Sequence, residues 1–454
     1  MSNGILPSYL SMAKPNPPGN RAPWYKNTAP TYAGIFLWVV FYMKIADGTL
    51  PQAGLGLTLL GLVVAALICH YLFYLVPGLY GMKTGYPLYV VGSSTYGATG
   101  GFLMPGLLMG VLQFGWVAVN IAVSTSFILQ AVGADASPGK PAFVVVAILW
   151  GLAAAFVGVK GIQYVAKVAT FLPIVPLIMI LVVFFTNVGS AGNFKAPEGA
   201  NPLMGFLTII AIVVGFFATA GAAGVDFGMG SRDKKDVQMG GLVGIALAII
   251  IAGGLPLIAI AGAHGANPDM ESFDFDAVIS QQGGFLARSM FILFAIASFA
   301  PICFSSFIAA NSIGTMFPKA NKMGMVLIGA IVAIVLAVTG VALNLVGVFQ
   351  IIGASFGPVC GSMAADYLLS GRRWCGPRKG INWAGYIAWA VGFVVAILPM
   401  VAKDKFGFIT PAPVIAFVIG FVLYAVLAKA GLEPAVVALG AYRGGLTLRP
   451  EIEP

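Results

Sequence analysis

Charged residues are scarce in this sequence. They make up 9% of its 454 residues, while 59% of the residues are hydrophobic and the mean hydropathy is +0.96. A soluble globular chain carries about a quarter charged residues, so this composition excludes that class. The sequence instead predicts a protein that crosses a lipid bilayer many times.

Residues that bind metals or form disulfides are also few. The chain has two histidines, His70 and His264, and four cysteines with no C-x-x-C pair. These counts exclude a disulfide framework, a zinc site and H-E-x-x-H chemistry. A phosphate-binding Walker motif is absent as well, so we expect neither an enzyme nor a cofactor. The proline-rich first thirty residues lack the order of a cleavable signal peptide.

The apolar residues fall into twelve runs, each long enough for one membrane span. They cover 31–54, 57–79, 103–131, 141–159, 165–187, 203–226, 239–262, 285–316, 323–342, 345–370, 384–401 and 411–429. Threading the chain through these runs places most Lys and Arg on one side, together with both termini. The positive-inside rule makes that side cytoplasmic, so both tails, 1–30 and 430–454, are predicted to be cytoplasmic. The basic charge thus reflects topology, and nucleic acid is not an expected partner.

Two of the runs, 31–54 and 203–226, are interrupted at their centres. The first contains Lys44, Asp47, Gly48 and Pro51, and the second contains Gly215, Gly221 and Gly224 around Thr219. The two runs lie five helices apart. Interrupted spans at matching places in two five-helix halves are typical of inverted-repeat transporters with a site at mid-membrane.

Polar residues recur on one face of the run 103–131. Gln113, Trp116, Asn120 and Ser124 are spaced by three, four and four residues, which puts them on one side of a helix. Amides beside a large aromatic ring in a membrane favour a binding site for a flat polar solute. The alternative is a polar seam that joins two helices.

Several short motifs resemble the nucleobase:cation symporter-1 family of purine, cytosine, allantoin and hydantoin permeases. They are Gly81–Pro87 (GMKTGYP), Tyr96–Gly100 (YGATG), Gly115-Trp116, Asp226-Phe227, Ser305–Asn311 (SSFIAAN), Gly357-Pro358, Ala365–Tyr367 and Asn382-Trp383. The resemblance implies a leucine-transporter-like, all-α membrane fold of about twelve helices. In that fold, 31–187 and 203–370 are the two inverted repeats, and 384–429 holds two peripheral helices.

The resemblance also implies a substrate site. Trp116 stacks on the substrate ring, Asn120 and Asn311 are amide contacts, and Phe217 takes the place of a second stacking aromatic. Thr219 and Gln113 are further substrate-binding candidates. Two aromatic faces and a few amides suit a planar ring with donors and acceptors on its edge.

Ser305 and Ser306 align with hydroxyls that bind sodium in sodium-coupled members, together with carbonyls from the interrupted first helix. Lys44 and Asp47 depart from the family pattern there, which puts sodium in doubt. Three interpretations stay open. The Lys44 ammonium replaces the ion in a sodium-independent or proton-linked cycle, Lys44 pairs with Asp47 as a gate, or Asp47 binds a cationic substrate. Snorkelling of Lys44 from a helix edge is a further alternative.

Two aspartates, Asp226 and Asp366, lie at predicted cytoplasmic helix ends, and we expect them to anchor loops. The acidic segment 264–276 is predicted to be a solvated outer loop. The sequence as a whole predicts a multi-pass inner-membrane permease that imports a small planar nitrogen-containing ring with sodium or a proton. The alternative is a non-transporting scaffold, or a subunit of a larger complex, that kept the fold. The sequence does not indicate an oligomeric state.

Overall fold

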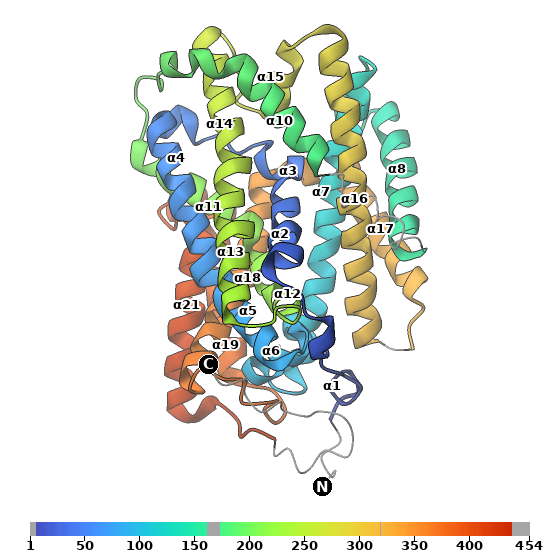
Figure 1. The fold of residues 1–454 in the computed structure, drawn as a ribbon, viewed down its shortest axis with the longest axis vertical. Helices are drawn as coiled ribbons and strands as arrows, with labels where there is room; N and C mark the ends of the chain where they lie inside the picture. The colour runs from blue at the N-terminus through green and yellow to red at the C-terminus, as the bar shows by residue number, and fades with distance from the viewer. Residues whose placement is uncertain (1–5, 161–172, 318, 438–454) are drawn as a thin grey trace.

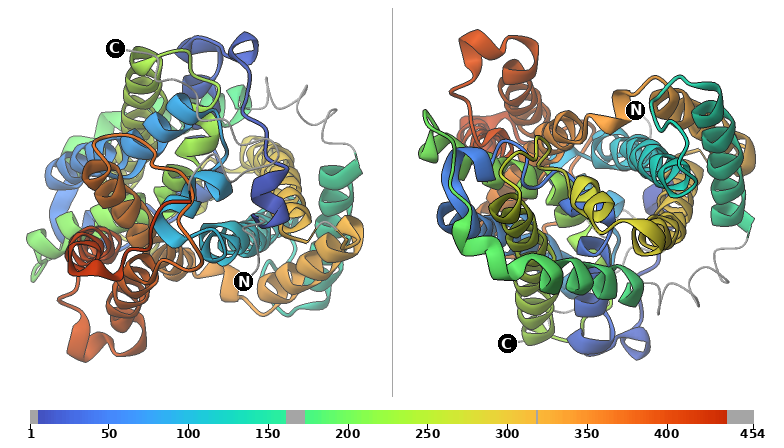
Figure 2. Two further views of the ribbon diagram at one scale, coloured as in Figure 1. Left: turned by 90° about the horizontal axis from the view of Figure 1, so that it is seen from below. Right: turned by 90° about the horizontal axis from the view of Figure 1, so that it is seen from above.

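The computed structural model describes residues 6–160, 173–317 and 319–437. Over these residues the chain is almost entirely helical and has no β-strand. The long helices run along one axis and pack side by side (Figure 1), and a view down that axis shows most of them nearly end-on (Figure 2). Ten helices of the described chain are long and apolar enough to cross a membrane.

The helices of the first half of the chain begin with short segments and continue with long ones. They are α1 (Ser8–Ser11), α2 (Thr28–Phe36), α3 (Val39–Tyr42), α4 (Leu50–Ile68), α5 (Leu75–Thr84), α6 (Leu88–Tyr96), α7 (Leu108–Ala131), α8 (Pro141–Lys160) and α10 (Ile174–Asn187). A π-helical turn, Cys69–Tyr74, joins α4 to α5 into one span of 35 residues.

The second half repeats this mixture of short and long helices. It contains α11 (Pro202–Ala222), α12 (Gly224–Gly228), α13 (Lys234–Gly241), α14 (Ala248–Ala266), α15 (Phe275–Gln281), α16 (Gly284–Met316), α17 (Lys322–Val338), α18 (Leu345–Leu369), α19 (Trp383–Val401), α20 (Lys403–Phe406) and α21 (Ala412–Leu427). The all-α membrane fold that the sequence predicts is therefore confirmed. The start of the predicted span 165–187 lies outside the described residues.

The first predicted span, 31–54, is wrong in its position and in its break. The helix unwinds earlier, at Trp38, whose backbone is extended (φ −66°, ψ 128°), and it ends at Tyr42. Gly48 then turns the chain with a positive φ of 65°, and α4 starts at Leu50 with Pro51 in its first turn, which a kink at Gly54 (φ 66°, ψ 173°) separates from the rest of α4. Proline is favoured in the first turn of a helix, so Gly48 and Pro51 mark a helix start rather than an interruption.

The sixth predicted span is not interrupted at its centre: α11 is continuous through Gly215, Thr219 and Gly221, and it gives way to α12 only at Ala223, near the end of the predicted run. Before this point, α11 approaches α18 very closely. A Cβ atom added to Gly215 would lie 2.6 Å from the carbonyl oxygen of Phe349, a distance that real Cβ atoms essentially never show. Only glycine permits this contact, which brings Phe349 to the middle of the molecule.

Both ends of the described chain lie at the same end of the molecule. The Tyr9 hydroxyl donates to the carbonyl of Ala98 (2.6 Å), and the Ala98 amide donates to the carbonyl of Arg378 (2.7 Å). Arg378 in turn pairs with Glu433, close to the last described residue. This arrangement agrees with termini on one side of the membrane, and which side that is stays a prediction.

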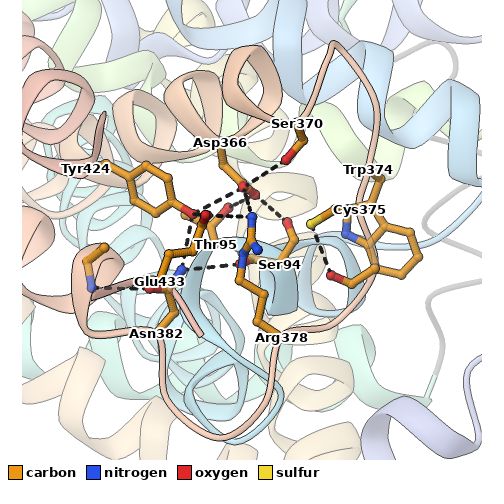
Figure 3. A network of polar contacts seen from close by, with 12 residues as sticks. Ser94, Thr95, Asp366, Ser370, Trp374, Cys375, Arg378, Asn382, Tyr424 and Glu433 are labelled. Atoms are coloured by element: carbon orange, nitrogen blue, oxygen red, sulfur yellow. Dashed lines mark hydrogen bonds and ion pairs between the residues drawn. The ribbon is translucent and has the colours of Figure 1, made fainter. Parts of the chain in front are cut away.

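A buried polar network joins four segments at this end (Figure 3). The Asp366 carboxylate, near the end of α18, is fully buried and pairs with Arg378 at 3.1 Å. It also accepts hydrogen bonds from Ser94 of α6 (2.6 Å) and Tyr424 of α21 (3.1 Å). The prediction that Asp366 anchors loops is therefore confirmed.

We expect Arg378→Ala to lower the thermal unfolding midpoint of the purified chain strongly. The change leaves the Asp366 and Glu433 carboxylates without their cation, and breaking a buried ion pair in this way destabilises a protein by about 3–5 kcal/mol. Arg373→Ala, an exposed arginine of the same loop, is the control and should leave the midpoint unchanged. Equal midpoints for the two variants would contradict this role for Arg378.

Candidate substrate site

The predicted polar face of the third span lies inside the protein. Gln113, Trp116 and Asn120 are all buried on α7, at the level where α7 packs against α16. Ser312 of α16 donates its hydroxyl to the carbonyl of Gly106, in the π-helical turn Leu103–Leu107 just before α7, at 2.7 Å, and it also lies against Gly110 of α7. The face thus points into the bundle and away from lipid.

Trp116 is the centre of this face. Its indole Nε1 donates to the Thr219 hydroxyl of α11 at 3.2 Å, so the structure brings together two of the predicted site residues. The Phe349 ring of α18 lies over the indole, with centroids 5.8 Å apart and an interplanar angle of 34°. The Phe216 ring meets it edge-on at 5.0 Å. Contacts from α11 and α18 therefore fix the orientation of the indole on α7.

Asn120 lies one turn further along α7 and has one free acceptor. Its Nδ2 donates to the carbonyl of Trp116 at 2.9 Å, which uses the amide donor within the helix. Its Oδ1 is fully buried and has no hydrogen-bond partner among the described residues. A buried unpaired carbonyl is unfavourable by about 1–3 kcal/mol, so this atom is ready to accept from a bound solute.

Phe217 does not lie beside Trp116. Its ring stacks on Phe36 of α2, with centroids 5.7 Å apart and 22° between the planes, and it also contacts Tyr32. Successive residues of a helix point about 100° apart, so the preceding residue, Phe216, meets Trp116 instead. In this structure Phe217 is therefore not placed to hold a substrate ring against Trp116, as the resemblance had implied.

Asn311 also lies away from the site. Its side chain is exposed on α16, whereas the next residue, Ser312, donates to the Gly106 carbonyl just before α7. In the structure as it stands, Asn311 does not join Trp116 and Asn120. Gln113 stays on the same face as Trp116, and its amide donates to the Met109 sulfur at 3.5 Å.

Lys44 and Asp47 lie beyond the end of α3 and outside the helical part of the first span. Lys44 forms an ion pair with Asp274, in the loop before α15, and Asp47 is exposed. The structure thus contradicts both a mid-membrane Lys44 and a Lys44–Asp47 gate. The reason is the early end of the first helix, which carries both residues into a loop.

Ser305 and Ser306 are both buried in α16. The Ser306 hydroxyl has no hydrogen-bond partner among the described residues. Serine hydroxyls in helices usually donate to the carbonyl four residues earlier, as Ser298 does to Phe294 at 2.9 Å. The unpaired Ser306 oxygen therefore remains available to a ligand.

Two aromatic neighbours of Trp116 were not predicted from the sequence. Phe216 adjoins the predicted Phe217, and the sequence does not show which of the two faces inward. Phe349 lies more than 200 positions from Trp116 in the sequence and belongs to a run with no polar stripe. In the sequence, Gly215 is the signal that another helix approaches closely, because glycine has no side chain to prevent such an approach.

Comparisons with known proteins agree with this architecture. No family model matches the chain. It is 28% identical to the cytosine permease of Escherichia coli (strain K12) over 326 residues, which cover 69% of this chain and 72% of the relative.

Solved structures share the fold over nearly the whole chain. Mhp1, a nucleobase-cation-symport-1 family transporter, matches in a closed conformation with bromovinylhydantoin bound (TM-score 0.68, 16% identity, 96% of this chain and 98% of the other). Its inward-facing conformation matches with a TM-score of 0.67 at 17% identity, over 92% and 95% of the chains. A Na⁺-coupled sialic acid symporter matches with a TM-score of 0.54 at 15% identity, over 95% and 93%.

The chain is a multi-pass membrane protein, and the proteins that it is similar to are transporters rather than enzymes. The resemblance to the nucleobase:cation symporter-1 family is thereby confirmed. More particularly, the chain is a homologue of cytosine permease with the fold of a nucleobase-cation symporter.

We expect Thr219→Val to destabilise the chain by about 1–3 kcal/mol, because the buried Trp116 Nε1–H loses its acceptor while the shape of the side chain is kept. The thermal unfolding midpoint of the purified chain is the measurement. Thr125→Val is a matched control, since the Thr125 hydroxyl is buried without a partner in the described chain. It should be neutral or stabilising, and a larger loss for Thr125→Val would contradict the Trp116–Thr219 contact.

Proposed function

We propose that this protein imports a small planar nitrogen-containing ring, of the nucleobase, hydantoin, allantoin or vitamin-like kind, by cation-coupled alternating access. The observation that carries the proposal is the unpaired carbonyl oxygen of Asn120, one turn from the indole of Trp116. An acceptor beside an aromatic face matches a flat solute with an N–H or amino group on its edge.

The aromatic neighbours of Trp116 support this assignment. Phe349 covers one face of the indole and Phe216 meets it edge-on. A planar solute that stacks on the Trp116 indole would lie among residues of α7, α11 and α18. Because Asn120 lies one turn along α7 from the indole, a ring without a donor on that edge leaves the carbonyl unpaired, and this difference is the basis of selectivity.

Two interrupted helices support alternating access. The first span unwinds at Trp38, and in the sixth span α11 gives way to α12 at Ala223. Unwound backbone inside a membrane is tolerated where it is buried or lines a cavity. We assign the two breaks to inverted repeats 31–187 and 203–370, which rock against each other in an inner membrane with both termini in the cytoplasm.

Sodium is the coupling cation that the described residues favour over a proton. The doubt about sodium came from Lys44 and Asp47, and their place in a loop, where Lys44 pairs with Asp274 and Asp47 is exposed, weakens that objection. Ser305 and Ser306 supply hydroxyl oxygens inside α16, and the Ser306 oxygen has no other partner in the described chain. Sodium binds well to such neutral oxygen ligands.

The function is tested by uptake into proteoliposomes. Radiolabelled cytosine, hydantoins, allantoin and purines are offered one at a time, with sodium and proton gradients imposed separately. Concentrative uptake of one of these rings supports the proposal. Uptake that never exceeds equilibrium identifies a passive channel, and no uptake of any ring under either gradient favours a scaffold that kept the fold.

Asn120→Leu should lower the apparent affinity for the transported ring about 5-fold to 150-fold, because an edge N–H loses its acceptor at 1–3 kcal/mol. The unfolding midpoint should stay the same or rise, since an unpaired buried carbonyl has been removed. Ser126→Ala, another buried residue of α7, should leave the affinity unchanged. An unaltered affinity in Asn120→Leu would show that the ring binds elsewhere.

Ser306→Ala should raise the sodium concentration needed for half-maximal uptake about tenfold or more, because one oxygen ligand is lost. The change should leave uptake at saturating sodium largely intact. Ser298→Ala is the control, since the Ser298 hydroxyl is buried in the same helix and bonded to the Phe294 carbonyl. Equal sodium dependence in wild type and Ser306→Ala contradicts the sodium assignment of Ser306.

A further inference from the structure

The end of the molecule opposite α1 is covered by α15 and the segment before it (Figure 1). Phe275, the first residue of α15, is fully buried. Its ring meets Tyr42 edge-on at 5.1 Å and Phe294 at 6.1 Å. Its amide donates to the carbonyl of Met43 at 3.0 Å. The start of α15 is thus inserted between the end of the first span and α16.

Polar contacts flank this aromatic insertion. On one side, the Lys44 ammonium pairs with the Asp274 carboxylate, with exposed fractions of 29% and 20% for the two side chains. On the other side, the Gln130 amide at the end of α7 donates to Asp276 at 3.2 Å. The segment is therefore held to the first span through Lys44 and to the third span through Gln130.

We propose that residues 267–281 form a lid over this end of the bundle and that the Lys44–Asp274 ion pair is the latch that keeps it closed. The lid lies over helices that carry the site, since α7 bears Trp116 and α16 bears Ser306. The proposal concerns closure of the transporter and does not depend on which ring is carried.

The Lys44–Asp274 ion pair contributes only a small net free energy to the closed lid. Burial raises the pKa of the Asp274 carboxyl above its usual range, and the neighbouring Asp276 and Asp47 act in the same direction, although Lys44 opposes them. The ionised carboxylate is therefore less favourable in the closed lid than in water. A half-buried ion pair of this kind returns little net stabilisation, which suits a contact that breaks in every transport cycle.

The same reasoning predicts opposite effects for two kinds of substitution. Removing Lys44 alone leaves the Asp274 carboxylate half-buried without its cation, so the lid should open. Replacing both partners by apolar side chains of similar size removes the burial of charge altogether, and such replacements are often neutral or stabilising. The lid should then stay closed.

Hydrogen exchange on the full chain in lipid nanodiscs measures lid opening directly, without any solute. The reporters are the backbone amides of Phe275 to Ile279, followed by mass spectrometry of peptides from 267–283. Lys44→Ala should speed their exchange about tenfold or more, because exchange follows the population of the open lid. Exchange at the wild-type rate in Lys44→Ala would overturn the latch.

Two controls test whether the ion pair itself is responsible. Lys44→Arg keeps the charge and should leave the lid amides at the wild-type rate. Asp47→Asn removes an exposed carboxylate of the same loop that disfavours the ionised Asp274, so it should leave lid exchange unchanged or make it slower. If Asp47→Asn speeds exchange as much as Lys44→Ala does, the effect belongs to the charge of the loop as a whole and the latch is refuted.

The double variant Lys44→Met with Asp274→Leu separates lid opening from general unfolding. Amides of α18 and α21 report on the rest of the fold, and they should stay at the wild-type rate in every variant. If Lys44→Ala also speeds the exchange of the α18 and α21 amides, lid exchange in the double variant distinguishes lid opening from general unfolding. Lid exchange at or below the wild-type rate supports the latch, whereas faster lid exchange in the double variant than in Lys44→Ala overturns it.

Discussion

A lipid bilayer offers no water to satisfy polar groups, and this constraint shapes every unusual feature of the chain. The polar residues of α7 are buried in the bundle, and the two interrupted helices have their breaks among other helices. The Asp366–Arg378 pair and the Lys44–Asp274 pair lie toward opposite ends of the molecule. Among the described residues, the buried side-chain atoms without a hydrogen-bond partner include Asn120 Oδ1 on α7 and the Ser306 hydroxyl on α16.

The sequence was a good guide to the spans because hydrophobicity and span length follow directly from the thickness of the membrane. The buried face of α7 was also predictable, since helical spacing places Gln113, Trp116 and Asn120 on one side. The first span was mispredicted because apolar residues continue past Tyr42 in sequence, whereas Gly48 and Pro51 serve the start of α4. Hydrophobicity alone does not distinguish a span from an apolar turn between two spans.

The remaining errors concern which way a side chain points. Phe216 and Phe217 are equivalent in composition, and only the packing of α11 decides that Phe216 faces Trp116. Asn311 matches the family motif by position, yet its side chain is exposed in this conformation. Lys44 finds its partner 230 positions along the chain, in a segment that the sequence predicts to be only a solvated loop. Pairings of this range depend on tertiary structure and have no local signature.

The close approach at Gly215 has a consequence for how this site can vary. The Phe349 backbone presses on Gly215, so the distance between α11 and α18 is set by the absence of a side chain there. Phe349 covers the Trp116 indole only because the two helices are so close. The contact between the Phe349 and Trp116 rings therefore depends on Gly215, which touches neither ring with a side chain of its own, and alanine at this position would require α18 to move away from α11 and to carry Phe349 with it.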